Sequence, residues 1–206
     1  MGMEVMCFDL EGVFVPEIWI NVADHTGIDD LRLTTRDVPD YDQLMRHRLS
    51  ILDREGLTID DIQSVIATLS PMPGARDFLD WARSQFQVVI LSDTFYEFAA
   101  PLMDHLGHPA LFAHNLTIDE NRRIVGYALR MPDQKRAAVE AFRSLNFSVF
   151  ACGDSYNDTA MLLAADRGFL FRPPATVIEE FPQLPVTSTY DDLRSSLIAA
   201  SSRDIH

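Results

Sequence analysis

Residues 5–13 have the sequence VMCFDLEGV, in which a short apolar run ends at two acids and a glycine. Such a run predicts a buried strand whose polar residues begin where the strand ends. Because side chains alternate along a strand, Asp9 and Glu11 are expected on one side, and Gly12 permits a sharp turn behind them. Two convergent carboxylates bind a divalent cation, or one of them works as a general acid, or both. A turn with two solvated acids is the alternative that this segment alone leaves open.

Three other apolar runs share this character and predict the remaining strands of one sheet. Residues 88–91 end at Ser92, residues 149–152 lead to Asp154, and the last run is residues 168–171. Continuous apolar runs of this length, separated by helical patterns, indicate a parallel sheet that is covered on both faces. The predicted fold class is therefore α/β, a doubly wound parallel sheet whose ligands bind at the carboxyl edge of the strands. The intervening helices are expected at residues 75–86 and 132–145.

Residues 14–72 interrupt this alternation and predict an inserted helical cap. They hold three successive helical patterns without a convincing strand between them, and glycines close the first two. Pro16 and Glu17 suit the first turn of the first helix. The catalytic core is accordingly assigned to residues 1–13 and 73–206. The three cap helices are expected at residues 19–25, 40–55 and 59–69.

Some segments and side chains lie outside this pattern. Residues 111–129 alternate around a polar turn and predict a hairpin, which would form a small flap beside the sheet. The tail from Ser201 is expected to be loose. Cys7 and Cys152 lie in apolar runs and are expected to be inert core thiols rather than a disulfide. No role is assigned to the histidines that are expected on a helix end and a loop, which are His105, His108 and His114.

The chain carries a net charge of −14, from 17 basic and 31 acidic side chains. Such a field repels polyanions, and the sequence has no basic patch of the size that nucleic acids require. Neither nucleic acid nor an anionic membrane is therefore expected as a partner, and a site that handles phosphate would need a cation and local donors. No apolar stretch has the length of a membrane span or the pattern of a signal peptide, so a cytoplasmic location is expected.

A second acidic strand end supports the interpretation of the first. Asp154 and Asp158 are four residues apart, at the end of one strand and the start of a helix. Aspartates at a helix start are ordinarily caps, and that alternative would suffice if the motif stood alone. Two acidic strand ends in one parallel sheet instead imply a shared site that is rich in oxygen ligands. Such a site suits Mg²⁺ better than Zn²⁺ because no cluster of Cys or His accompanies it.

Lys135 lies in the first helical turn that is predicted after Asp133, where the helix dipole disfavours a cation. A nearby anion would resolve this conflict, so Lys135 can neutralise a phosphate or keep a carboxylate ionised. Ser92, at the end of the preceding strand, adds a hydroxyl donor in the same region. Taken alone, Lys135 would be interpreted as a solvated lysine.

These motifs, in this order, resemble the haloacid dehalogenase-like superfamily of phosphotransferases, and the resemblance spans residues 9–158. The resemblance implies that Asp9 attacks phosphorus and carries the phosphoryl group as an aspartyl-phosphate, while Glu11 occupies the acid/base position. Ser92 and Lys135 would hold the phosphoryl oxygens, which is how positioning and charge neutralisation catalyse phosphoryl transfer. The implied ligands of Mg²⁺ are Asp9, Asp154 and the backbone carbonyl of Glu11, with Asp158 as a supporting residue.

The substrate must be inferred from the cap, because phosphate handling is generic. Arg48 lies among the hydrophobic residues of the apolar stripe on the helix predicted at residues 40–55. An arginine that snorkels to the edge explains this position as well as a ligand role does. A guanidinium that faces the site would suit a substrate carboxylate. Glu17 could meet a substrate ammonium, or it could be an ordinary first-turn acid. Together, Arg48 and Glu17 would bind an amino acid headgroup.

At this point the resemblance narrows to phosphoserine phosphatases, whose cap glutamate and arginine match Glu17 and Arg48, and whose last motif has an Asn at the position of Asn157. The chain departs from them in two places, since Glu11 replaces the usual second Asp and Asp93-Thr94 replace the usual glycines. These departures resemble the bifunctional branch that passes phosphate from phosphoserine to homoserine as well as to water. The candidate substrate-binding residues are therefore Glu17, Arg48, Ser92, Asp93, Lys135 and Asn157.

Alternative functions follow from the same residues. The runner-up is a phosphatase for another small phosphomonoester, such as a sugar, nucleotide or pyridoxal phosphate. A phosphorylation-switched receiver domain has no use for so large a cap, and a silent binding module would not retain every charged group of the site. The expected partners are a small phosphate donor, phosphoserine, and water or homoserine as the acceptor. The oligomeric state is undecided, with a homodimer as one alternative.

Overall fold

A seven-stranded sheet forms the centre of the computed structural model, which describes residues 3–34, 37–38 and 40–203. The strands lie in the order β4-β3-β2-β1-β5-β6-β7, and all neighbours pair in parallel except β3 and β4. The four strands predicted from apolar runs are confirmed. The strand bounds are β1 Met3–Phe8, β2 Gln87–Phe95, β3 Ala110–Ile118, β4 Ile124–Ala128, β5 Phe147–Gly153, β6 Arg167–Phe171 and β7 Val186–Thr187.

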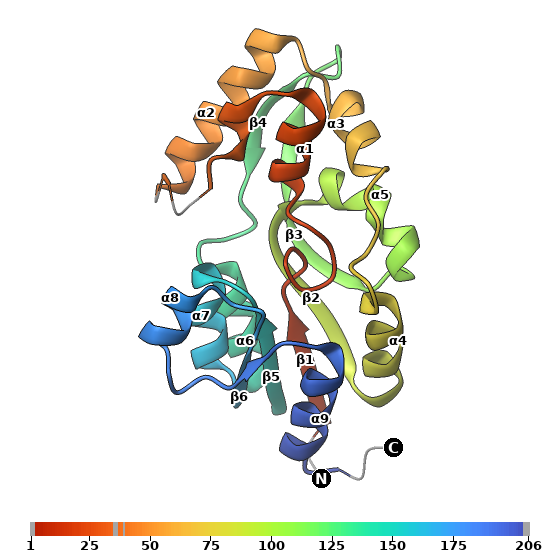
Figure 1. Ribbon diagram of the computed structural model, residues 1–206, viewed down its shortest axis with the longest axis vertical. Coiled ribbons are helices and arrows are strands. Elements are labelled where there is room, and N and C mark those ends of the chain that lie inside the picture. Colours follow the sequence, from red (N-terminus) through yellow and green to blue (C-terminus); the bar gives the residue numbers. More distant parts are fainter. Residues whose placement is uncertain (1–2, 35–36, 39, 204–206) are drawn as a thin grey trace.

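Helices cover both faces of the sheet, which explains the continuous apolar strands (Figure 1). In β1, Met6 and Phe8 are buried in one hydrophobic cluster, whereas Val5 and Cys7 are buried in a second cluster on the opposite face. The doubly wound α/β fold is therefore confirmed. Within the described ranges, none of the helices is both long and apolar enough to cross a membrane. The first cluster includes side chains of α4 (Ala75–Gln85), α5 (Tyr96–Leu106) and α9 (Tyr190–Ala200), and the second those of α6 (Gln134–Ser144), α7 (Tyr156–Ala164) and α8 (Ala175–Glu180).

The strand order reverses at β1. The chain adds β2 and β3 on one side of β1, and it adds β5, β6 and β7 on the other. In an open parallel sheet, the crevice above the carboxyl ends of the strands at such a reversal is the usual ligand site. Asp9 follows β1 and Asp154 follows β5, so both acids stand at this crevice.

Both cysteines are buried and free, as predicted. Cys7 and Cys152 belong to different hydrophobic clusters on opposite faces of the sheet, which keeps their thiols apart. Burial raises the pKa of the Cys7 thiol to about 12, so it stays protonated and unreactive.

In the part of the cap that the structure describes, three α-helices and one 3-10 turn lie above the carboxyl edge of the sheet (Figure 1). The three predicted helices are confirmed, whereas the 3-10 turn was not foreseen. Pro16 and Glu17 precede the first helix instead of forming its first turn, because the backbone of Glu17 is not helical, with ψ at 114°. The bounds are α1 Ile18–Thr26, η1 Asp29–Arg32, α2 Tyr41–Glu55 and α3 Ile59–Ile66.

The cap is packed onto the core by one continuous hydrophobic cluster. Met45 of α2 and Ile62 of α3 belong to the same cluster as Phe8 of β1. The two connections between cap and core also contact each other, since Met72 N donates a hydrogen bond to Phe14 O at 2.8 Å. The division of the chain at 13/14 and 72/73 stays a prediction.

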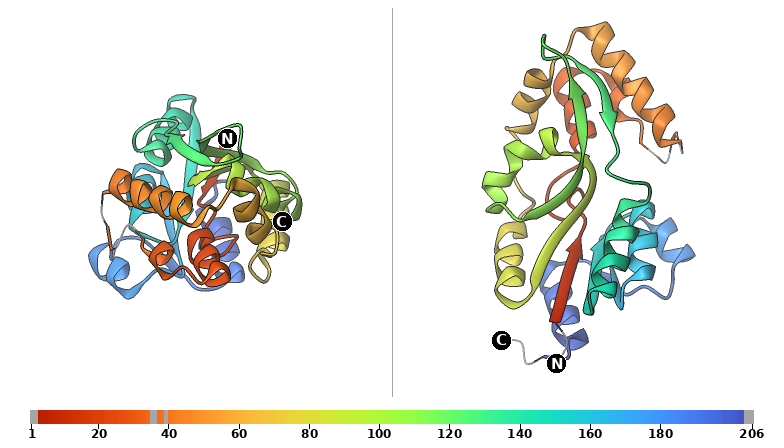
Figure 2. Two further views of the ribbon diagram at one scale, coloured as in Figure 1. Left: turned by 90° about the horizontal axis from the view of Figure 1, so that it is seen from above. Right: turned by 180° about the vertical axis from the view of Figure 1, so that it is seen from behind.

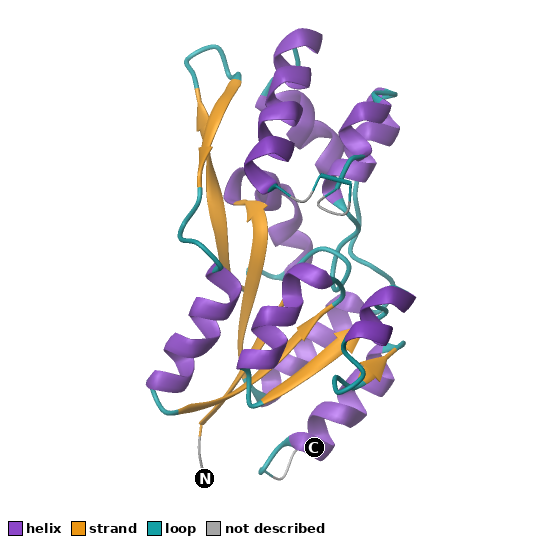
Figure 3. Cartoon of the chain, turned by 90° about the vertical axis from the view of Figure 1, so that its left-hand side faces the viewer, coloured by secondary structure: helices purple, strands orange, loops and turns teal. Residues whose placement is uncertain are grey.

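The hairpin predicted at residues 111–129 is present, but it is more than a flap beside the sheet. The first part of β3 pairs in parallel with β2, so β3 is a full member of the sheet. Its second part pairs with β4, and this arm extends along the cap (Figures 2 and 3). At the hairpin turn, Arg122 O accepts a hydrogen bond from Ile59 N at 2.9 Å, and Arg122 Nε donates to Asp60 at 3.0 Å. The prediction of a flap beside the sheet is wrong, because the alternating pattern of the hairpin does not reveal that β3 also pairs with β2.

The tail from Ser201 is held as far as Arg203, contrary to prediction, and residues 204–206 lie outside the described residues. Its anchor is Glu4 of β1, which is 3 % exposed. Glu4 Oε2 accepts hydrogen bonds from Ser201 Oγ at 2.7 Å and Arg203 Nε at 3.0 Å. Glu4 Oε1 accepts one from Ser202 N at 3.0 Å. The composition of the tail does not reveal a partner at the opposite end of the chain.

We expect Glu4→Gln to lower the free energy of unfolding by about 2 kcal/mol, because an amide accepts fewer of these hydrogen bonds than the carboxylate does. Burial raises the pKa of Glu4, but the hydrogen bonds from Ser201 and Ser202 and the charge of Arg203 outweigh it. The pKa therefore lies below its ordinary value of 4.5. A depressed folded pKa stabilises the protein above the unfolded pKa, and this contribution is lost as the pH falls through the folded value.

Urea unfolding of the wild type and Glu4→Gln at several pH values measures this effect. The difference should be full at neutral pH and shrink below about pH 4. Glu140→Gln is the matched control, since the Glu140 side chain is 52 % exposed and pairs with Arg136 at the surface. It should change stability by less than about 0.5 kcal/mol. Equal losses in the two variants would contradict the anchor role of Glu4.

Candidate active site

Asp9 is the first residue after β1, and its orientation follows from the alternation of that strand. It shares the phase of Val5 and Cys7, whose side chains face the cluster formed with α6 and α7. Asp9 N still donates to Cys152 O at 2.9 Å, so strand pairing persists to this residue. The side chain is buried, and its Oδ1 accepts a hydrogen bond from Leu10 N at 2.7 Å. No residue that the structure describes donates a hydrogen bond to Oδ2.

Lys135 approaches Asp9 from the first turn of α6, as predicted. Its Nζ lies 2.9 Å from Asp9 Oδ1, 2.7 Å from Asp158 Oδ1 and 3.5 Å from Asp93 Oδ2. Burial lowers the pKa of Lys135, but the three carboxylates more than reverse this, and the pKa lies well above its ordinary value. Lys135 therefore stays charged. Asp133 precedes the helix without capping it, since its backbone is left-handed with φ at 46° and its side chain accepts no capping hydrogen bond.

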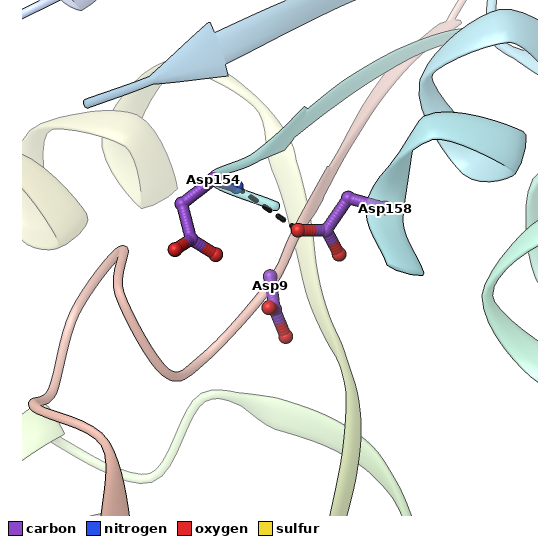
Figure 4. Close-up of side chains that lie close together, drawn as sticks. All are labelled: Asp9, Asp154 and Asp158. Carbon is purple, nitrogen blue, oxygen red and sulfur yellow. Dashed lines mark hydrogen bonds between the residues drawn. The ribbon is translucent and has the colours of Figure 1, made fainter. Parts of the chain in front are cut away.

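The turn from β5 into α7 holds the second acidic pair. Asp158 Oδ2 accepts hydrogen bonds from Asp154 N at 2.9 Å and Ser155 N at 3.1 Å, while its Oδ1 binds Lys135. A Cβ atom on Gly153 would lie 2.3 Å from the carboxyl carbon of Asp158, so the close approach requires glycine. Both oxygens of Asp158 are thus engaged within the protein, whereas the Asp154 carboxyl group lies at the crevice (Figure 4).

Asp9, Asp154 and Asp158 form an acidic cluster that could bind a metal ion (Figure 4). One oxygen from each lies within 4.8 Å of the others. Burial and the charge of Asp158 raise the pKa of Asp154 to about 7 and raise the pKa of Asp9 well above its ordinary value. A bound cation would relieve this concentration of negative charge. Gly12, with a φ of +74°, provides space for the Asp154 carboxyl group, because a Cβ atom on residue 12 would lie 2.5 Å from that group.

β2 ends in an irregular segment that presents polar residues to the crevice. Its pairing with β3 shifts register before Phe95, at the segment that holds Ser92, Asp93 and Thr94. Ser92 is buried, and its Oγ accepts a hydrogen bond from Thr94 N at 3.3 Å, which leaves the hydroxyl proton for a ligand. Gln134 Nε2 supports the segment by donating to Ser92 O at 2.5 Å.

Glu11 lies in the turn after β1 and faces the start of the cap. Its Oε2 accepts a hydrogen bond from Ile18 N at 2.8 Å. Burial, followed by the charge of Glu17, raises the pKa of Glu11 to about 7. A carboxyl group with such a pKa can give and accept a proton near neutral pH. The position of the side chain therefore agrees with an acid/base role.

Arg48 of α2 is buried, with 7 % of its surface exposed, and does not reach the edge of the cap. Its guanidinium lies over the ring of Trp19, 4.5 Å from the ring centroid. One terminal nitrogen donates to Leu33 O at 2.7 Å, whereas Nε has no hydrogen-bond partner within the described residues. Burial lowers the pKa of Arg48 to about 10, which still leaves it charged. An unpaired buried N–H is costly, so this site favours a ligand with a carboxylate.

Most of these groups surround one cavity of about 250 Å³ between the cap and the carboxyl edge of the sheet. Glu17, just before α1, lies on the cap side of this cavity. Asp158 is the one predicted site residue that does not reach it, because it lies behind Lys135. The predicted residues that line the cavity are Asp9, Glu11, Glu17, Arg48, Ser92, Asp93, Lys135, Asp154 and Asn157.

Several residues of the site were missed from the sequence. Tyr41 and Trp19 line the cavity from the cap, and the Tyr41 hydroxyl donates to Asp93 O at 3.3 Å. Neither was predicted as a site residue, because both reach the site only through the packing of the cap on the core. His114 was expected on a loop, but it lies in β3, is 4 % exposed and places Nε2 3.8 Å from Asp93 Oδ1. The position of His114 inside the predicted hairpin was the one feature of the sequence that indicated a strand residue.

Residues 3–166 match the family model described as haloacid dehalogenase-like hydrolase, which covers most of the chain. The chain belongs to the haloacid dehalogenase-like hydrolases. The resemblance drawn from the acidic strand ends, Ser92 and Lys135 is thereby confirmed at the level of the family.

This hydrolase has close relatives along nearly its whole length. It is 60 % identical over 203 residues to the phosphoserine phosphatase ThrH of Pseudomonas aeruginosa, with 98 % of the chain and 99 % of the relative covered. It is 58 % identical over 204 residues to a phosphoserine phosphatase of Pseudomonas syringae pv. tomato, with 99 % and 86 % covered. A solved substrate-bound phosphoserine phosphatase complex matches the hydrolase with a TM-score of 0.76 at 18 % identity, with 98 % and 100 % covered. At 18 % identity, this structural match is evidence for the fold alone.

Proposed function

We propose that this hydrolase is a Mg²⁺-dependent phosphoserine phosphatase that forms an aspartyl-phosphate on Asp9 and can also pass the phosphoryl group to homoserine. The observation that carries the proposal is the single cavity that joins Asp9 and Lys135 of the core to Arg48 and Glu17 of the cap. The names of two relatives, 60 % and 58 % identical to the chain, support the same donor.

The first half-reaction uses groups that the cavity brings together. An oxygen of Asp9 forms a bond to phosphorus while the bond between phosphorus and the seryl oxygen breaks. Glu11, in its protonated form, donates a proton to the departing seryl oxygen. Lys135 and Ser92 hold the phosphoryl oxygens through this step, and their donors stabilise the charge that develops on them.

The second half-reaction returns Asp9 to its free state. The hydroxyl group of water or homoserine gives its proton to Glu11, and its oxygen attacks phosphorus. The bond between phosphorus and Asp9 breaks, and orthophosphate or phosphohomoserine is released. Homoserine carries the same headgroup as serine with one more methylene, so Arg48 and Glu17 would hold either molecule in the place that serine vacates.

The residues at the crevice fit a magnesium ion. Its protein ligands would be Asp9, Asp154 and the backbone carbonyl of Glu11, since Mg²⁺ prefers oxygen ligands. The acidic cluster and the space beside Gly12 support this assignment. When bound, Mg²⁺ supplies neutralisation of the phosphoryl charge. Asp158 orients Lys135 and the turn that carries Asp154.

Incubation with phosphoserine tests this function directly. With Mg²⁺ present, we expect serine to be released in an amount equal to the sum of orthophosphate and phosphohomoserine, and phosphohomoserine to form only when homoserine is added. Excess EDTA should reduce turnover by more than about a hundredfold, because the acidic cluster would then carry uncompensated charge. Chromatography of the amino acids and a colorimetric phosphate assay follow all three products.

Two controls define what would refute the proposal. Phosphoethanolamine has the ammonium group of phosphoserine but no carboxylate, so it should be a much poorer donor if Arg48 binds the headgroup. Equal rates with phosphoethanolamine, a sugar phosphate and phosphoserine would instead indicate a general phosphomonoesterase. Turnover that EDTA leaves unchanged would contradict the metal assignment.

A further inference from the structure

Asp93 lies where five elements meet and carries a charge that the proposed chemistry does not use. It belongs to the end of β2, and its Oδ1 accepts a hydrogen bond from Gln134 Nε2 of α6 at 3.2 Å. Its Oδ2 accepts one from Asn157 Nδ2 of α7 at 3.4 Å. Tyr41 of α2 donates to its backbone oxygen, and His114 of β3 lies beside its carboxyl group. Two side-chain amides therefore donate to this carboxylate, and the Lys135 ammonium group lies 3.5 Å from it.

The surroundings keep Asp93 ionised. Burial raises the pKa of Asp93, but the charge of Lys135 and the hydrogen bonds from Gln134 and Asn157 outweigh it. Its pKa consequently lies below the ordinary value of 3.8. The Asp93 side chain therefore carries a full negative charge near neutral pH, where the enzyme would work.

Lys135 does not depend on Asp93 to stay in place. Asp9 and Asp158 bind Lys135 Nζ at 2.9 and 2.7 Å, whereas Asp93 Oδ2 is 3.5 Å away. The Asp93 side chain is also 34 % exposed and borders two cavities, the active-site cavity and a neighbouring one of about 280 Å³ beside the connection from β4 to α6. Its charge therefore faces any anion that binds Lys135 from the active-site cavity.

We propose that Asp93 lowers the affinity of the site for free orthophosphate and so promotes release of that product. The part that concerns turnover rests on the proposed function. An orthophosphate held by Ser92 and Lys135 would bring its anionic oxygens against the Asp93 carboxylate. Like charges a few ångströms apart in a partly buried site repel strongly enough to weaken binding by about tenfold or more.

The repulsion discriminates between ligands because only one of them has a compensating contact. Phosphoserine experiences the same unfavourable charge, but its headgroup would gain contacts with Arg48 and Glu17. Orthophosphate has no headgroup and so no way to offset the repulsion. Asp93 thereby lets the site bind a phosphorylated amino acid without retaining the orthophosphate that hydrolysis leaves behind.

Asp93→Asn tests the proposal, since the amide keeps the shape of the side chain and an oxygen that accepts from Gln134. Calorimetry with orthophosphate and Mg²⁺, at a mildly alkaline pH where orthophosphate is chiefly a dianion, measures the affinity without any turnover. We expect the variant to bind orthophosphate about tenfold more tightly than the wild type. Orthophosphate should likewise become about a tenfold stronger competitive inhibitor of para-nitrophenyl phosphate hydrolysis.

Asp133→Asn is the matched control. Asp133 borders the neighbouring cavity but not the active-site cavity, and asparagine tolerates its left-handed backbone. This variant removes the same charge and should change the affinity for orthophosphate by less than about twofold. Unchanged or weaker binding in Asp93→Asn would overturn the proposal, because a carboxylate that merely positions Lys135 and Asn157 would lose affinity when neutralised. Tighter binding in an enzyme that fails to hydrolyse phosphoserine would refute the proposed function but not this inference.

Discussion

Replacing Asp9 by asparagine should lower the rate of phosphoserine hydrolysis by more than about a thousandfold, which corresponds to about 4 kcal/mol in the barrier. Asp9 is placed at the reversal of the strand order with Oδ1 bound to Lys135 and Oδ2 without a donor among the described residues. An amide in this place cannot act as the anionic nucleophile that forms the phosphoenzyme. Acid quenching followed by intact-mass measurement should show one added phosphoryl group on the wild type and none on Asp9→Asn.

Two further variants separate nucleophilic attack from other effects of Asp9→Asn. Asp104→Asn removes a charge from an exposed side chain, 84 % accessible, that pairs with His108, and it should leave the rate within about twofold. Asp9→Glu keeps a carboxylate for the cation but displaces it by one methylene, so Mg²⁺ binding should survive better than turnover. A phosphoryl group found on Asp9→Asn, or near-normal activity in it, would exclude the mechanism.

Replacing Arg48 by alanine should reduce kcat/KM for phosphoserine by about a hundredfold or more and change that for para-nitrophenyl phosphate by less than about threefold. Arg48 is a buried cation of the cap, and its Nε has no hydrogen-bond partner among the described residues. A charge-assisted hydrogen bond to a substrate carboxylate explains both features. Para-nitrophenyl phosphate has no carboxylate, so it reports on the phosphoryl chemistry alone.

Matched variants control for the packing of Arg48 against Trp19. Arg46→Ala changes an exposed arginine of the same helix and should leave both substrates unaffected. Arg48→Lys retains the charge without the planar fork and should recover only part of the activity with phosphoserine. If Arg48→Ala lost activity equally on the two substrates, the role of Arg48 would be structural and not headgroup recognition.

The sheet was predictable because each of its central strands is a continuous apolar run that ends in a polar residue. The runs before Asp9, Ser92 and Asp154 carry enough signal by themselves, since only strands buried on both faces need such sequences. The three cap helices were predictable from the spacing of their apolar residues, and glycines close the first two. The reach of the hairpin from β3 to the cap and the anchoring of Ser201 on Glu4 were not, because both depend on partners far along the chain.

The residues of the site were likewise predictable in part. Acids and donors at strand ends predicted Asp9, Glu11, Ser92 and Asp154, because parallel strands bring their carboxyl ends to a common edge. Tyr41, Trp19 and His114 were not predicted, since they reach this edge through the packing of other elements. A histidine in a strand or an aromatic residue in a helix is ordinarily core, and nothing local distinguishes these.

The sequence by itself determined the acidic strand ends, with Asp9 as the candidate nucleophile, and the presence of a helical cap, since these depend on local patterns of apolar and charged residues. Tertiary structure alone decided how the charges are shared. Lys135 contacts the carboxylates of Asp9, Asp158 and Asp93. Asp158 does not line the cavity, and the charge of Asp93 faces the place where phosphate would bind. Electrostatic interactions depend on distances and burial between segments far apart in the chain, and only the packed fold sets those.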